Sequence, residues 1–147
     1  MGVKVKVKRL TEDAVLPSRA HASDAGFDLV AAWKEKDEHG NVVYGTGLAF
    51  EIPEGYAGLV FPRSSNARKR LGLTNGVGVV DAGYRGEVTM KFKGLWSIGG
   101  GATERDYMIG ERIGQLVIVK LPDVEFEESE ELSESERGTG GYGSTGR

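Results

Sequence analysis

Cysteine is absent from the 147-residue sequence, and histidine occurs only at positions 21 and 39. The chain therefore has no disulfide, cysteine nucleophile or cysteine-ligated metal, and two histidines argue against a multi-histidine zinc site. No apolar stretch approaches the ~20 residues of a membrane helix, and the basic N-terminal residues are not followed by the apolar core of a secretory signal. We expect a protein with no membrane association that works in the cytoplasm, or inside a host cell if its source is viral.

An excess of basic residues is also missing, because the formal net charge is -3. Duplex-binding proteins usually carry a basic face, so we expect no stable nucleic-acid binding. Proline is scarce, with 4 residues, whereas glycine is abundant, with 23. Glycines at this density favour the many tight turns of a barrel or sandwich, and the length fits one domain.

The periodicity of the chain predicts strands with almost no helix. Valine and lysine alternate through residues 3–8, which is typical of a strand with one solvated face. Further strands are expected at 26–32, 41–44, 47–52, 56–61, 77–80, 87–92 and 112–121, and one short helix at 66–71. The glycine run 99–101 is interpreted as a flexible loop rather than a phosphate-binding loop. The pattern predicts an all-β fold.

The composition changes after Pro122, which divides the chain into three parts. Residues 1–121 form the predicted β domain, 122–136 an acidic linker, and 137–147 a tail with five glycines in eleven residues. Within the linker, Val124 and Phe126 are spaced to anchor a short strand. The tail combines Arg137, Tyr142 and a glycine-hydroxyl run, groups that could close over a nucleotide, although a disordered end explains the composition equally well.

Two acidic segments are candidates for chemistry. Residues 81–87 connect two predicted strands, and a carboxylate at Asp81 could accept a proton from water while Tyr84 walls a pocket; an ordinary turn is the alternative. Asp24 and Asp28 lie four residues apart with Gly26 between them, so strand alternation would place both on one side. Such a pair could hold a hard cation, or one aspartate could simply form a turn.

Two polar segments complete the candidates. Ser64 and Ser65 follow a predicted strand and precede the short helix, where they could cap the helix or direct donors at a phosphate. Gln115 is the one polar residue in a long apolar strand, so its amide requires partners.

Taken in order, five segments resemble the five motifs of the trimeric dUTP pyrophosphatases, at residues 24–29, 62–65, 75–87, 110–116 and 137–146. The resemblance implies a jelly-roll-like β-barrel subunit whose C-terminal arm is exchanged in a homotrimer. It further implies that active sites shared between subunits use Mg2+ to hydrolyse dUTP to dUMP and pyrophosphate. Such an enzyme limits uracil in DNA and supplies dUMP for dTMP synthesis.

The resemblance also assigns roles to single residues. Asp81 matches the catalytic aspartate that activates water, and Asp28 matches the carboxylate that contacts magnesium through water, with Asp24 as a possible second. The matching substrate-binding positions are Arg63, Ser64, Ser65, Asn75, Gly78, Val80, Tyr84, Lys91, Gln115, Arg137, Tyr142, Gly143, Ser144 and Thr145. Among these, Asn75 and the 76–80 hairpin would read uracil, Tyr84 would stack on deoxyribose, and Tyr142 would cover the base.

The sequence departs from the family pattern at two places. Tyr142 stands where phenylalanine is commoner, and Ser65 with Asn66 where a glycine and an aliphatic residue are commoner. Two other functions remain as alternatives. A dCTP deaminase of the same fold group would use Glu87 as its carboxylate, and a dUTP-sensing regulatory protein could present the charged 34–40 segment to a partner.

Overall fold

The computed structural model describes residues 2–95 and 106–146, and within them the fold is all-β, as predicted. The glycine run 99–101 lies outside the described residues. The elements are β1 (Lys6–Arg9), β2 (Phe27–Val30), β3 (Trp33–Lys36), β4 (Val42–Glu51), β5 (Tyr56–Pro62), α1 (Asn66–Lys69), β6 (Leu71–Leu73), β7 (Gly78–Val80), β8 (Glu87–Gly94) and β9 (Arg112–Lys120).

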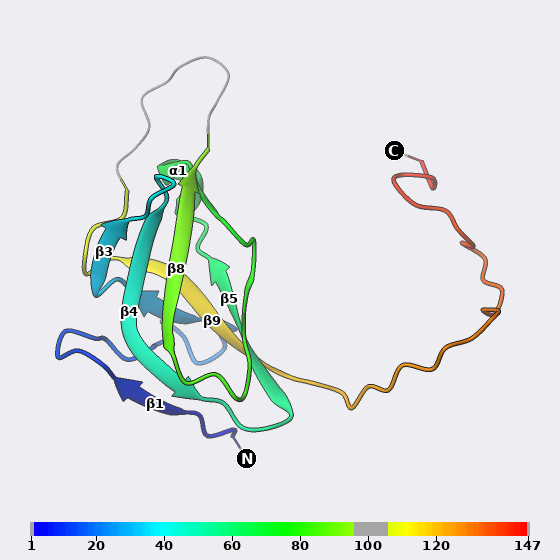
Figure 1. Ribbon diagram of the computed structural model, residues 1–147, viewed down its shortest axis with the longest axis horizontal. Helices are drawn as coiled ribbons and strands as arrows, with labels where there is room; N and C mark the ends of the chain where they lie inside the picture. The colour runs from blue at the N-terminus through cyan, green and yellow to red at the C-terminus, as the bar shows by residue number, and fades with distance from the viewer. Residues whose placement is uncertain (1, 96–105, 147) are drawn as a thin grey trace.

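The strands form two antiparallel sheets (Figure 1). One sheet has the order β1-β4-β8-β6, with β3 also paired to β4, and the other has the order β2-β9-β5-β7. β1 and β3 share one edge of β4, since β3 pairs with residues 42–45 and β1 with residues 48–51. Apart from β3 and β4, which pair with each other, consecutive strands alternate between the sheets, and this brings segments distant in sequence together.

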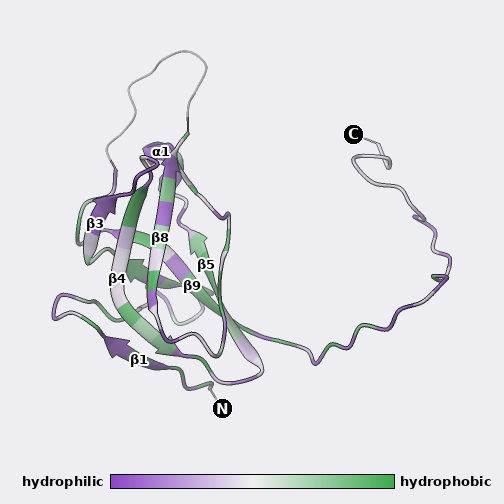
Figure 2. Ribbon diagram, viewed as in Figure 1, coloured by the Kyte–Doolittle hydropathy of each residue, from purple (hydrophilic) through white to green (hydrophobic). Residues whose placement is uncertain are grey.

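The core lies between the sheets. Tyr44, Phe92 and Tyr107 are almost fully buried, and their rings meet in edge and tilted contacts at centroid distances of 5.8–6.0 Å. The Tyr44 hydroxyl donates to the Tyr107 carbonyl at 2.9 Å, so burial of this polar group costs no hydrogen bond. Figure 2 shows the contrast with β1, which is hydrophilic and exposed along its whole length.

The two strands predicted at 41–44 and 47–52 are one continuous strand, β4, with an irregular register between Gly45 and Ala49. Gly45 and Gly47 lie within this strand, and Gly45 has a definite purpose there. A Cβ there would lie 1.9 Å from the Trp33 indole, which packs across the strand. The glycine therefore makes room for an aromatic side chain and does not end the strand.

The sequence did not indicate β3 or β6. β3 has three charged residues among four and forms because its backbone completes the edge of β4. The helix predicted for 66–71 ends earlier, at Lys69, because Arg70 adopts a left-handed backbone with φ 49° and its N–H bonds to the Asn66 carbonyl. Leu71 is consequently the first residue of β6.

After β9 the chain leaves the barrel as an extended arm (Figure 1). Residues 121–146 have no strand or helix in the structure, and Phe126 is 96% exposed. Hydrogen bonds of the glycine-rich end join neighbours within it, such as Arg137 Nε to the Gly140 carbonyl at 2.7 Å. No helix in the described residues is long and apolar enough to span a membrane.

Candidate functional site

The first cleft lies where β7 of one sheet meets β8 of the other, and it has a volume of about 190 Å³. Asp81 and Tyr84 line it from the turn between these strands. The other lining residues are Val60, Leu73, Asn75, Gly78, Val79, Val80, Glu87, Val88 and Thr89. The structure thus brings together five predicted residues, at positions 75, 78, 80, 81 and 84, in a pocket of mixed valine and polar lining with an exposed carboxylate.

The 81–86 turn holds the Tyr84 ring in a defined position. The Tyr84 amide donates to the Asp81 carbonyl at 3.0 Å, and its hydroxyl donates to the Glu87 carbonyl at 2.9 Å. The ring lies so close to Gly86 that a Cβ there would be 2.5 Å from the hydroxyl. The tyrosine is 46% exposed, so one side of its ring remains free to meet a ligand.

Glu87 also lines this cleft, but its carboxylate is occupied. Its Oε2 atom accepts the Trp33 indole N–H at 2.7 Å and the Gly47 amide at 3.1 Å. A general acid–base needs a carboxylate that can reach the substrate and exchange protons. Glu87 instead joins β8 to β3 and β4, which does not favour the dCTP deaminase alternative.

A second cleft, of about 400 Å³, gathers the charged candidates. Asp28 Oδ1 lies 3.3 Å from Arg63 Nε, and Asp28 Oδ2 lies 3.4 Å from Arg112 Nη1. Ser64 and Gln115 also line this cleft. Arg63 and Arg112 together carry more N–H donors than the Asp28 carboxylate can accept. The remaining donors are suited to bind phosphate oxygens.

Gln115 finds the partners that its position demands. Its Nε2 donates to the Pro62 carbonyl at 3.2 Å, and its Oε1 points toward Gly26, where a Cβ would lie 2.2 Å away. The absence of a side chain at Gly26 therefore leaves room for Gln115. A side chain at position 26 would displace the glutamine that joins β9 to the end of β5.

Asp24 also lines the second cleft, but it lies before β2, so strand alternation does not place it. Its Oδ2 accepts a hydrogen bond from the His21 amide at 2.9 Å. Asp24 therefore forms a turn, which was the alternative to a cation-binding pair. The described residues contain no group of three acidic, histidine or cysteine side chains able to hold a metal. Asp28 is thus a single carboxylate for a cation whose other ligands would come from elsewhere.

Ser65 lies apart from Ser64. Its hydroxyl pairs with the buried Tyr107 hydroxyl at 2.9 Å and forms no side-chain cap on α1. It lines an adjoining cavity of about 520 Å³ together with four basic residues, Arg63, Arg68, Lys69 and Arg112. Arg63 and Arg112 line both cavities, so positive charge continues from the second cleft over α1.

Lys91 and the arm are not gathered with these groups. The Lys91 ammonium lies 3.2 Å from Asp37, in the turn between β3 and β4, and lines neither cleft. Arg137, Tyr142, Gly143, Ser144 and Thr145 lie on the extended arm (Figure 1). Arg112, by contrast, lines the second cleft but was not among the predicted site residues. The sequence did place it in the same 110–116 motif as Gln115, and this could have indicated its role.

The two clefts face opposite sides of the β2-β9-β5-β7 sheet. Asp28, Gln115 and Phe61 form one row across three strands, while Val60 and Leu116 belong to the next row, which is buried. Successive rows of a sheet point to opposite faces. Asp28 and Gln115 therefore face away from the core, whereas the first cleft opens between the sheets at Val60, and the two linings share no residue.

Comparison with known proteins gives this arrangement a context. A family model described as dUTPase matches residues 12–146. A deoxyuridine 5'-triphosphate nucleotidohydrolase of Rhodococcus erythropolis is 43% identical over 146 residues, covering 98% of this chain and 87% of the relative. A mutant dUTPase of Staphylococcus bacteriophage 80alpha with dUpNHpp has a TM-score of 0.80 at 32% identity, with 98% and 99% of the two chains covered.

A further solved structure, a mutant dUTPase from phage phi11 of S. aureus with a structural Mg(II) ion, has a TM-score of 0.69 at 30% identity. It covers 87% of this chain, and the match includes 97% of the phage chain. The family model spans most of the sequence, and the bacterial relative spans nearly all of it. The chain therefore belongs to the dUTPase family.

Proposed function

We propose that this protein is a dUTP diphosphatase that hydrolyses dUTP to dUMP and pyrophosphate. The observation that carries the proposal is the first cleft, where a carboxylate, a tyrosine ring and a narrow hairpin line one small pocket. Family membership supplies the substrate, and the cleft supplies groups suited to a base, a sugar and an attacking water. No covalent protein nucleophile is needed for this reaction.

In this mechanism Asp81 accepts the proton of the water that attacks the α-phosphate. Positioned general bases contribute about 10²–10⁴-fold to such reactions. Asp81 is exposed at the end of β7, so a water molecule can reach it. The neighbouring 81–84 hydrogen bond fixes the backbone that carries the carboxylate.

The same pocket accounts for selection of the substrate. The hairpin through Gly78 and Val80 has backbone groups for the edge of uracil, and Val60 stands 3.2 Å from where a Cβ of Gly78 would lie. A base with a different edge would leave buried polar groups unpaired. The Tyr84 ring would lie against deoxyribose and collide with the 2′-hydroxyl of a ribonucleotide.

The triphosphate would bind at the second cleft, with Arg63, Ser64 and Gln115 as donors and with Arg112 added by the structure. A magnesium ion would arrive with the substrate, since one carboxylate cannot hold it alone and Asp28 suits contact through water. Bound there, the metal would supply neutralisation of phosphate charge. Asp24, engaged in its own turn, is the weaker candidate for this contact.

We propose that each active site forms between chains of a homotrimer. The two clefts face opposite sides of one sheet, so one nucleotide is better served by the first cleft of one chain and the second cleft of another. The arm from a further chain would close the site, with Arg137 on the γ-phosphate, Tyr142 over uracil, and Gly143 to Thr145 around the phosphates. In this division residues 1–121 form the barrel, 122–136 the spacer and 137–147 the flap.

The surface of the barrel offers a place for the exchanged arm. An apolar groove of about 470 Å³ is lined by Val3, Val5, Val7, Leu16, Pro17, Phe27, Phe50, Tyr56, Leu116 and Ile118. Val124 and Phe126 are 59% and 96% exposed on their own chain. Their burial in this groove of a neighbour would remove both apolar surfaces from water.

The direct test is release of pyrophosphate with magnesium, measured in parallel for dUTP, dTTP, dCTP and UTP. We expect rapid turnover of dUTP and little of the other three. Release of ammonia from dCTP, or comparable hydrolysis of all four nucleotides, would contradict the proposal.

A further inference from the structure

The turn that carries Asp81 and Tyr84 has little regular structure of its own. Between Val80 and Glu87 it has no strand hydrogen bonds, and it includes the small residues Ala82 and Gly83. A catalytic carboxylate and a sugar-binding ring nevertheless need fixed positions, because small displacements reduce rates strongly. The backbone hydrogen bond from the Tyr84 amide to the Asp81 carbonyl fixes only part of the turn, so contacts from side chains would limit its motion further.

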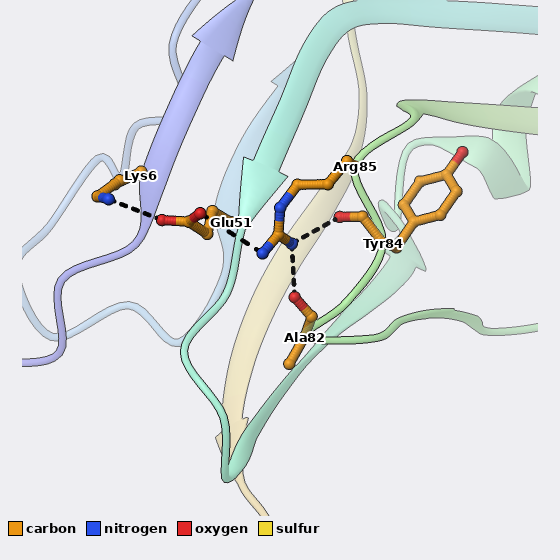
Figure 3. Close-up of polar contacts among 5 residues, drawn as sticks. All are labelled: Lys6, Glu51, Ala82, Tyr84 and Arg85. Atoms are coloured by element: carbon orange, nitrogen blue, oxygen red, sulfur yellow. Dashed lines mark hydrogen bonds and ion pairs between the residues drawn. The ribbon is translucent and has the colours of Figure 1, made fainter.

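Arg85 has the contacts to do this (Figure 3). Its Nη1 donates to the Ala82 carbonyl at 2.6 Å and to the Tyr84 carbonyl at 3.3 Å. One guanidinium therefore joins two carbonyls within the turn. Arg85 follows Tyr84 directly in the chain, and its side chain folds back over the turn. These contacts therefore restrict the backbone between Asp81 and Tyr84.

The guanidinium is itself held from the neighbouring sheet. Its Nη2 lies 3.5 Å from Oε1 of Glu51, the last residue of β4. The other oxygen of Glu51 lies 2.9 Å from Lys6 Nζ, and these two residues are register partners of β4 and β1. The Lys6 hydrogen bond and charge, followed by the charge of Arg85, lower the pKa of Glu51 below its ordinary value.

We propose that Arg85, oriented by Glu51 and Lys6, is a positioning residue that holds Asp81 and Tyr84 in their catalytic geometry. The inference rests on the proposed function, because it gives those two residues their roles. It extends the site to the N-terminal strand, which lines neither cleft. Arginine suits this role better than lysine, since its planar fork can reach both carbonyls and the carboxylate together.

We expect the Arg85–Glu51–Lys6 network to contribute more to catalysis than to the free energy of unfolding. Arg85 and Glu51 are about half exposed, with side-chain exposures of 53% and 44%. Ion pairs in such positions add little to the free energy of unfolding, because water screens them. Loss of the network should therefore leave the barrel folded and loosen the turn.

Arg85→Ala tests this directly, with Arg9→Ala as the matched control because Arg9 is an exposed arginine of β1. We expect kcat for dUTP to fall on the order of 10-fold or more in the Arg85 variant, with an unchanged Tm and a higher ratio of UTP to dUTP turnover. Arg85→Lys should recover part of the loss. Unchanged kcat, or a loss that matches a lowered folded fraction with the ratio unaltered, would overturn the proposal.

The lysines of β1 provide a second matched pair. Lys6 and Lys8 lie on the same face of the strand, and Lys8 pairs in register with Ala49 instead of an acid. Lys6→Met should lower kcat slightly and Lys8→Met should not. Glu51→Gln should lower kcat in the native background but have no further effect with Arg85→Ala. Equal effects of Glu51→Gln in both backgrounds would contradict action through Arg85.

One measurement separates this inference from the proposed function. Amide hydrogen exchange of residues 81–86 should be faster in Arg85→Ala than in the native chain or in Arg9→Ala. If the native protein is inactive toward dUTP, the proposed function fails, whereas the exchange rates still test the bracing of the turn. Identical exchange in all three proteins would refute the bracing itself.

Discussion

At the scale of single residues, the two groups of candidate residues lie in different clefts. Asp81 and Tyr84 lie together in a turn, while Asp28 is paired with Arg63 and Arg112 on another face. The Asp28 carboxylate is thus already occupied by two guanidinium groups. Asp81 makes no such pair in the described structure, which suits it to the role of base.

Replacement of Asp81 by asparagine tests this assignment. Asp81→Asn keeps the size of the side chain but removes the group that accepts the proton, so we expect kcat to fall by about 10²–10⁴-fold. Binding of dUTP, followed by calorimetry without turnover, should persist. Near-normal release of pyrophosphate would place the base elsewhere, and Asp13→Asn provides an exposed control.

Tyr84 tests the selection of the sugar. Without the ring, a ribose 2′-hydroxyl meets no obstacle, so Tyr84→Ala should raise the turnover of UTP relative to dUTP. The ratio of kcat/KM for the two nucleotides, measured on one preparation, gives the answer. Tyr84→Phe serves as control, since it keeps the ring and loses only the hydrogen bond to the Glu87 carbonyl. An unchanged ratio in the alanine variant would refute the role.

At the scale of elements, the β3–β4 hairpin shows how one acid organises a turn. Asp37 accepts the amides of His39 and Asn41 and the Asn41 side chain at 2.9–3.0 Å, and it pairs with Lys91. The Asn41 side chain, followed by the Asn41 amide, Lys91 and the His39 amide, lowers the pKa of Asp37 far below its ordinary value. Lys91 therefore has a structural partner on the described chain.

This lowered pKa fixes the pH dependence of a stability change. A depressed carboxyl pKa stabilises the fold above the unfolded value of about 3.9, and that contribution is lost as pH falls toward the folded value. Asp37→Ala should lower Tm at pH 7, and the difference from the native chain should shrink below about pH 4. Thermal unfolding across this range measures it, with Asp123→Ala in the arm as control. A difference that grows in acid would contradict the assignment.

The glycine-rich end of the arm can be deleted without removing any strand or helix. Truncation before Arg137 deletes only residues that lack barrel contacts in the structure, so the shortened chain should fold with an unchanged Tm. Turnover of dUTP should nevertheless fall by about 10²-fold or more, because the groups that close the site are gone. Full-speed hydrolysis by the shortened chain would show that the flap is not needed.

At the scale of the whole molecule, the proposed sharing of sites between subunits predicts complementation between defective chains. Asp81→Asn chains retain the arm, and truncated chains retain Asp81. If turn and arm come from different subunits, refolding an equal mixture should restore roughly a quarter of the sites by random assembly. Mixtures of either variant with itself are the controls. Absence of any recovery from mixed trimers would mean that one chain supplies both groups, and a strictly monomeric protein would contradict the trimer.

The sequence by itself determined the β class and most strand positions, and it named the candidate residues for the chemistry. Strand alternation and glycine-rich turns are local signals, so 56–62, 78–80 and 87–94 were close to their predicted bounds. The order of five short motifs identified the family because each motif keeps its own residues, whatever the fold around it. These properties depend on neighbours in the chain, which a sequence displays directly.

The tertiary structure alone decided which of those residues meet. Strand β3 exists because β4 has a free edge, Gly45 admits Trp33, and Glu87 is occupied by groups 40 and 54 residues away. The bracing of the 81–86 turn by Glu51 and Lys6 likewise depends on β1 and β4 lying side by side. Such contacts arise from the packing of strands remote in sequence, because burial and hydrogen bonding are satisfied in space and leave no local pattern.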